Sequence, residues 1–156
     1  MTASRPPRRL VAVAALALVL AGCSQTNPIQ TDRPYAPADG VQVTVGDLRV
    51  ENLLAVTTGA DEPGALSGAV VNSGSGEVDV TFTAGDSSAV LQVPAGGSVL
   101  FGTGSDTGET VLVDSVAAAP GALIDVTIAS DRDGSVTAQV PVLDGNEPPY
   151  DAVLAG

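Results

Sequence analysis

Short runs of valine, isoleucine and leucine alternate with polar residues over most of this 156-residue chain, from Gly40 to Val142. A period of two places successive side chains on opposite faces of a strand, and no long window shows the 3.6-residue period of an amphipathic helix. The pattern therefore predicts an all-β domain over residues 40–142. Strands are expected near residues 41–45, 48–56, 65–72, 78–82, 90–93, 99–101, 110–116, 124–128 and 136–142.

Clusters of glycine, serine, asparagine and aspartate separate these runs. Asn72–Gly76, Ala95–Gly97 and Asp131–Gly134 are expected turns, because Gly, Asn and Asp tolerate positive φ angles. Eight or nine short strands at this spacing are typical of an antiparallel Greek-key sandwich. Its core is expected to be almost entirely Val, Leu and Ile, with Phe82 and Phe101 as the aromatic side chains.

The first 22 residues have the parts of an export signal. Arg5, Arg8 and Arg9 precede an unbroken run of Leu, Val and Ala at residues 10–20. A membrane-spanning helix needs about 20 apolar residues, so this shorter run predicts a cleaved signal and not a permanent anchor. Arg8-Arg9 weakly resembles a twin-arginine signal. The general secretory route is favoured, because nothing downstream suggests a cofactor inserted before export.

Leu20-Ala21-Gly22-Cys23, at the end of this run, resembles the lipobox of bacterial lipoproteins. The resemblance implies that the Cys23 thiol receives a diacylglyceryl group and that cleavage makes Cys23 the mature N-terminus. The alternative is an ordinary secretory signal with an incidental cysteine, but Cys23 is the only cysteine in the chain. Two or more acyl chains anchor a protein durably. The expected location is therefore the outer face of the cytoplasmic membrane.

The expected organisation has four parts. Residues 1–22 are the signal peptide, and residues 23–39 are the lipidated cysteine and a proline-rich tether with a reach of roughly 20–25 Å. The sandwich occupies residues 40–142. Residues 143–156 are polar and interrupted by proline, and they are expected to form a flexible tail. Because large apolar groups are scarce outside the domain, Tyr35 in the tether and Tyr150 in the tail are candidate anchors for a protein partner.

The charge of the chain is strongly acidic. Eighteen Asp and Glu residues stand against six arginines, with no lysine and no histidine. Cleavage at Cys23 would remove three of the arginines and no acid, which leaves a net charge of −15. This balance argues against nucleic acid and against anionic lipid headgroups as partners. A basic protein or a cation is more plausible, and solubility alone is the other reading. The absence of lysine, with abundant Ala, Val, Gly and Asp, is typical of a high-GC genome, which fits an actinobacterium.

The side-chain inventory excludes several kinds of chemistry. Without histidine there is no Ser-His-Asp triad, and acylation of Cys23 would leave no thiol. Copper and zinc have no soft ligands in the mature chain. Asp131-x-Asp133-Gly134 resembles part of a calcium loop but lacks the further acidic ligands and the closing Glu. Residues 102–108 resemble a nucleotide-binding loop, but a strand follows where a helix is required. We therefore expect no enzyme, cofactor or metal site; a carboxylate-based hydrolase stays a weaker alternative.

Three segments carry a resemblance to a known family: Leu91–Val99, Ala122–Ser130 and Gly134–Val142. They resemble the periplasmic copper chaperones of the PCu(A)C type and, with the lipobox, the actinobacterial LpqE-like lipoproteins of that superfamily. The resemblance implies a cupredoxin-like or immunoglobulin-like sandwich. The His-x-Met copper ligands of the family fall on Thr110 and Leu112, which do not bind Cu(I). The copper role is therefore not implied for this chain, and no copper is expected.

Two function hypotheses follow for the mature protein. The first is a non-catalytic, membrane-anchored binding or accessory module in the cell envelope. The LpqE-like relatives are associated with the actinobacterial cytochrome bcc–aa3 assembly, so the resemblance implies a respiratory membrane complex as the first partner to test. The second is a divergent metallochaperone that has lost its ligands.

Overall fold

The structure is a computed structural model that describes residues 38–102 and 109–154, all within one compact unit, residues 36–156. The predicted signal peptide, the lipobox residues Leu20, Ala21 and Gly22, the lipidation site Cys23, and Tyr35 lie outside the described residues. So does most of the glycine-rich segment 102–108. Within the described part of the chain, no helix has the length and apolar character to cross a membrane.

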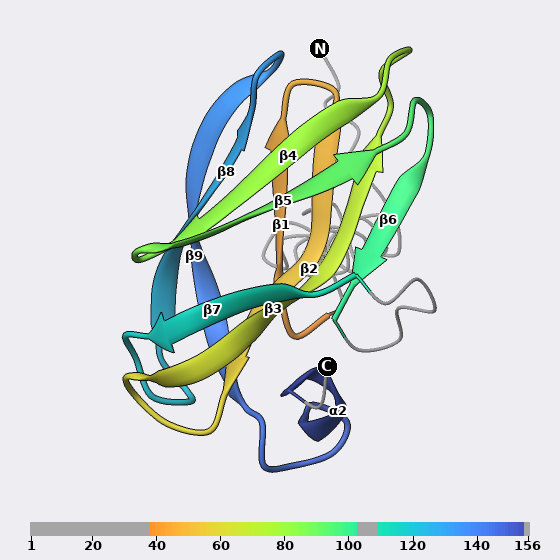
Figure 1. Cartoon of the computed structure of the whole chain (residues 1–156). Coiled ribbons are helices and arrows are strands. Elements are labelled where there is room, and N and C mark those ends of the chain that lie inside the picture. Colours follow the sequence, from red (N-terminus) through yellow and green to blue (C-terminus); the bar gives the residue numbers. More distant parts are fainter. Residues whose placement is uncertain (1–37, 103–108, 155–156) are drawn as a thin grey trace, which may run out of the picture. The chain divides into compact units, whose positions relative to one another are not determined.

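The described residues form nine strands and one short helix (Figure 1). The elements are β1 (Val41–Val45), β2 (Leu48–Thr57), β3 (Glu62–Asn72), β4 (Val78–Ala84), β5 (Ser87–Val93), β6 (Ser98–Phe101), β7 (Val111–Val116), β8 (Leu123–Ser130), β9 (Gly134–Asp144) and α2 (Asp151–Leu154). Each strand falls on one of the predicted runs, within three residues at either end, because the alternating valines and isoleucines set which face of each strand is buried.

The strands make two sheets that share β9. Sheet A contains β1, β2, β3, β6, β7 and the end of β9, and sheet B has the order β5-β4-β8-β9. Every pairing is antiparallel except that of β2 with β9, which is parallel through Ala55↔Val142 and its two neighbours. On the other side, the backbone N–H of Asp114 on β7 donates to Oγ of Ser87 on β5 at 2.9 Å. The predicted all-β sandwich is confirmed, as a mixed sheet that nearly closes into a barrel.

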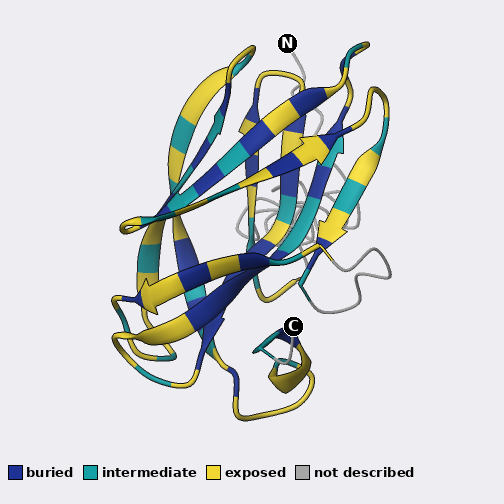
Figure 2. Cartoon of the chain, in the orientation of Figure 1, coloured by how far each residue is buried: buried dark blue, intermediate teal, exposed yellow. Residues whose placement is uncertain are grey.

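The main core lies between the two sheets. It is built from the inward-facing residues of every strand, and Figure 2 shows buried residues alternating with more exposed ones along β4. Phe82 and Phe101 pack against each other with ring centroids 5.2 Å apart and planes tilted by 52°. The two aromatic side chains expected in the core are both fully buried.

A buried asparagine joins the turns at one end of the sandwich. Nδ2 of Asn72 donates to the carbonyl oxygens of Gly76 (2.8 Å), Pro94 (3.2 Å) and Val93 (3.3 Å). Its Oδ1 accepts the N–H of Gly74 at 2.9 Å. One side chain therefore connects the β3–β4 and β5–β6 turns, and both lie where the sequence predicted turns.

The C-terminal segment differs from the flexible tail that we expected. β9 continues to Asp144, and Val153 in α2 is only 2% exposed. Val153 packs with Leu54, Val56 and Ala65 in a second, smaller cluster, against which Leu143, Tyr150 and Leu154 also pack. The ordered domain therefore extends past residue 142, because the tail covers apolar side chains on the outside of sheet A.

Candidate functional site

We define the outer face as the side of sheet A turned away from the main core. Its central members on β3 alternate with residues of the main core, and register places two residues of neighbouring strands beside them: Ala65 pairs with Leu112, and Ala69 with Leu100. Residues directly opposite in register project from the same side of a sheet. The outer face consists of Leu54, Val56, Ala65, Ser67, Ala69, Leu100 and Leu112.

The tail covers one half of the outer face. Leu54, Val56 and Ala65 are at most 1% exposed, because α2 and the segment before it pack on them. In Figure 1 the C-terminal helix lies beside the strands of sheet A. Without the tail, these three side chains would face solvent.

The other half of the outer face is open. Leu112 is 63% exposed and Leu100 is 48% exposed. Their partners Ala65 and Ala69 are four positions apart on β3, which separates the two leucines by about 13 Å along the strand. Single exposed leucines are normal in proteins. Two on one face, next to a patch that is already covered, mark this surface as the candidate site.

A β-bulge shapes the open half. The register of β2 with β3 shifts between Glu51 and Leu54, and Asn52 within the bulge has a positive φ of 51°. Beside it lies a shallow hollow of about 220 Å³, lined by Glu51, Asn52, Ser67, Gly68, Ala69 and Leu100. Bulges redirect side chains and are frequent next to binding sites. Oδ1 of Asn52 also accepts the N–H of Gly40 at 2.8 Å, so the bulge is tied to the start of the domain.

Carboxylates lie on the elements that border the open half. Glu51 is paired with Arg49 at 2.7 Å. Glu109 precedes β7, Asp114 shares a face of β7 with Leu112, and Asp151 begins α2; all three are exposed. Neither of the two ion pairs found among residues 38–102 and 109–154 includes any of these three. The rim of the face is therefore negative.

Tyr150, a candidate anchor for a partner, has an intramolecular role. Its ring packs against the second cluster and its hydroxyl donates a hydrogen bond to Oδ2 of Asp39. This hydrogen bond, assisted by partial burial and by the charge of Asp39, raises the pKa of Tyr150 above its ordinary value. Tyr150 therefore packs within the domain, although its segment was expected to form a flexible tail. Its role in binding a partner stays a prediction, as does that of Tyr35.

The structure also shows the positions that the sequence analysis considered as metal ligands. Leu112 lies on the outer face, and Thr110 lies just before β7. Asp131 and Asp133 occupy the turn between β8 and β9, where Arg132 pairs with Asp133 at 3.2 Å. Across the described ranges, no three His, Cys, Asp or Glu residues are grouped so as to hold a metal ion.

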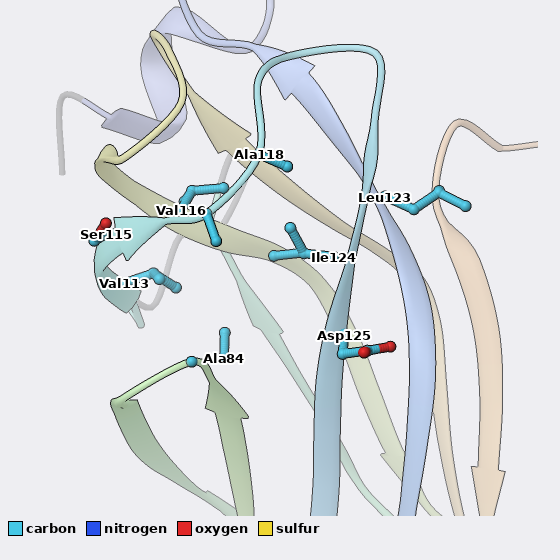
Figure 3. A pocket seen from close by; sticks show the side chains of 10 residues that line it. Ala84, Val113, Ser115, Val116, Ala118, Leu123, Ile124 and Asp125 are labelled. Atoms are coloured by element: carbon cyan, nitrogen blue, oxygen red, sulfur yellow. The ribbon is translucent and has the colours of Figure 1, made fainter.

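A second hollow, of about 340 Å³, lies between β7 and the start of β8 (Figure 3). Val113, Val116, Ile124, Ala84 and Ala118 form its apolar wall. In the close view Asp125 and Ser115 turn away from the space between these apolar side chains. Oδ1 of Asp125 accepts a hydrogen bond from Nε2 of Gln139. The wall therefore directs no acid or base inward, and it offers packing surface rather than catalytic groups.

One sequence signal for the outer face was missed. Residues 53–56, Leu-Leu-Ala-Val, are apolar without interruption, although a strand with one solvent-exposed face should alternate. A run that is apolar on both faces indicates that both are covered. Leu53 and Ala55 enter the main core, whereas Leu54 and Val56 enter the second cluster.

The fold and the outer face together define a β-sandwich of the cupredoxin-like and immunoglobulin-like kind, with an apolar, acid-rimmed outer surface. No protein-family description and no curated protein matches the sequence. Solved structures do match in fold. The copper-bound PCuAC domain from PmoF2 has a TM-score of 0.51 and 18% identity, and the match covers 67% of this chain and 98% of that domain.

Two metal-free structures give the same result. The apo PCuAC domain of PmoF2 has a TM-score of 0.54 at 16% identity, covering 69% of this chain and 98% of the domain. The apo PCuAC domain from PmoF1 has a TM-score of 0.51 at 16% identity, covering 65% and 98%. The predicted likeness to the PCu(A)C type is thus confirmed for the fold.

Proposed function

We propose that this protein is a membrane-anchored, extracytoplasmic lipoprotein that acts as a non-catalytic binding or accessory module, with a respiratory membrane complex as the first partner to test. The observation that supports a binding role is the chemistry of the outer face. At the positions where the family resemblance places copper ligands stand Thr110 and Leu112, and Leu112 is exposed on the same face of the sheet as Leu100. We also propose that the protein is an LpqE-like lipoprotein.

The proposed anchor is a diacylglyceryl group on Cys23, which follows Leu20, Ala21 and Gly22. Its acyl chains would hold the domain at the outer face of the cytoplasmic membrane. Cys23→Ala should leave uncleaved precursor. Its mass should exceed that of the mature chain by roughly 2 kDa, the mass of a signal peptide of this length. Processed and membrane-bound Cys23→Ala protein would contradict the anchor.

The test of the binding role is recovery of a partner from native membranes. The tagged, full-length protein is extracted in mild detergent, and the material that copurifies is identified by mass spectrometry. We expect one membrane complex to be enriched with the lipidated protein and to be lost with Cys23→Ala. If no complex is enriched over an unrelated tagged lipoprotein, the accessory role is rejected.

The second candidate is a divergent metallochaperone. The fold likeness to PCuAC domains, one of them copper-bound, favours it. The donor set opposes it, since the mature chain has no histidine or methionine and its one cysteine would be acylated. Titration with Cu(I) against a competing chelator separates the two. We expect no stoichiometric uptake, and a sub-micromolar site would favour the chaperone.

A further inference from the structure

We propose that the open half of the outer face is the surface on which this protein docks a basic protein segment, with Leu100 and Leu112 as the apolar contacts. This inference rests on the proposed binding role and adds the surface and the chemistry of the partner. The segment would carry lysine or arginine around at least one apolar side chain.

The apolar contacts come from the two exposed leucines. Their partners in register, Ala65 and Ala69, are small, so nothing on β3 rises above the leucine side chains. Between Leu100 and the bulge at Asn52 lies the hollow of about 220 Å³, which is large enough for one side chain. Burial of apolar surface drives association, so this hollow offers the partner a single apolar anchor point.

The charge of the rim selects the partner. Glu109, Asp114 and Asp151 are exposed on or next to β7 and α2, the elements that border the open half, and lie outside both ion pairs of the described residues. Among residues 38–102 and 109–154, the one cation next to the hollow is Arg49, which already pairs with Glu51. An acidic partner would meet uncompensated repulsion, whereas a basic one would find three carboxylates. Complementary rims mainly raise the association rate and fix orientation.

The covered half of the outer face also supports docking on the open half. The chain itself uses Val153, Tyr150 and Leu154 to cover the neighbouring apolar residues. A segment lying alongside α2 on the open half would make one continuous apolar contact with it. Because the apolar area is small, we expect a transient, salt-sensitive complex rather than an obligate one.

The test uses photo-cross-linking in the full-length protein in its native membranes. A benzophenone amino acid replaces Leu100 or Leu112, and in matched controls it replaces Val90 or Leu123, which are 59% and 55% exposed on other surfaces. We expect positions 100 and 112 to give about five-fold more of one protein adduct than the controls, as for residues at the centre of an interface. Peptide sequencing of the adduct should show a segment rich in lysine and arginine.

A second experiment tests whether the charge of the rim contributes to the cross-linking. Neutralising the rim with E109Q, D114N and D151N should lower the adduct yield about ten-fold at low salt, by the loss of electrostatic steering. The matched control, E77Q, D79N and D86N, removes the same charge from exposed positions on and beside β4 and should change it little. All substituted residues are exposed, and unchanged melting temperatures confirm folding.

The outcomes separate the two proposals. If the partner is enriched but all four positions cross-link equally, the docking face is wrong and the accessory role stands. An adduct to an acidic segment, or to lipid, overturns the basic partner. If no partner is enriched with the unmodified protein, the accessory role falls and the docking face with it.

Discussion

The hydroxyl of Tyr150, in the C-terminal segment, donates a hydrogen bond to the carboxylate of Asp39, which is 111 positions earlier and is the last residue of the proposed tether. The two ends of the domain are thereby joined beside the outer face. Asn52 adds a second connection through its hydrogen bond to Gly40. The point at which the tether leaves the domain is therefore fixed next to the candidate docking surface.

Tyr150→Phe should remove this hydrogen bond while keeping the ring in the second cluster. We expect a loss of about 0.5–1 kcal/mol in the free energy of unfolding near pH 7, as is usual for one exposed hydrogen bond. The pKa of Tyr150 is raised in the folded state, so its contribution is complete below the ordinary value of about 10 and is lost as the pH rises through the folded value. Urea unfolding of both proteins at pH 7 to 11 should therefore show the difference shrinking above pH 10. A difference that grows there would contradict the assignment.

Val153→Ala should destabilise the domain although it lies outside the predicted sandwich. The side chain is 2% exposed and packs on Leu54, Val56 and Ala65. We expect a loss of about 1–2 kcal/mol, in the range for deleting buried methyl groups. Ala152→Ser, at the exposed neighbouring position, is the matched control and should change stability by less than about 0.5 kcal/mol. Equal melting temperatures for wild type and Val153→Ala would mean that the tail is not part of the fold.

Asn72→Ala should be among the most damaging single changes in the domain. Asn72 is 1% exposed and its amide serves two turns. Its loss leaves buried carbonyl oxygens unsatisfied at about 1–3 kcal/mol for each group that water does not reach. Chemical denaturation should show a loss of about 3 kcal/mol, compared with almost none for Ser73→Ala at the exposed neighbouring position. A loss below that of Val153→Ala would indicate that water replaces the amide.

Phe82 and Phe101 should be energetically coupled. Either Phe→Leu change removes ring contacts in a core otherwise made of aliphatic side chains, and we expect each to cost about 1–2 kcal/mol. The double variant should cost less than the sum of the two, with a coupling of about 0.5–1.5 kcal/mol from the tilted ring pair. Strict additivity in urea unfolding would contradict the contact.

The strands could be predicted because alternation reports burial directly. Val78, Val80 and Phe82 fall on the inner face and are buried, as the pattern requires. Which strands pair with each other could not be predicted in this way. The parallel contact of Ala55 with Val142 has no signal in either strand, because a strand reads the same whichever neighbour it takes.

The outer face was only partly predictable. Leu112 drew notice through the family resemblance, but its relation to Ala65 needs the register of β3 with β7. Residues 146–150, Asn-Glu-Pro-Pro-Tyr, are polar and suggested a tail. The few apolar residues around them, such as Val153, are enough to cover a patch that no local pattern places beside them.

The strand that joins the two sheets, β9, is also the last strand among the described residues. β9 pairs with β8 just before it, but its final residues pair with β2, whose sequence position is distant. Such a contact closes a long loop, and its entropy cost makes it late to form. During synthesis the N-terminal part of the chain leaves the ribosome first. The sandwich cannot be completed until residues 134–144 have also left the ribosome. The sandwich should therefore remain open until β9 has been synthesised and has paired with β2.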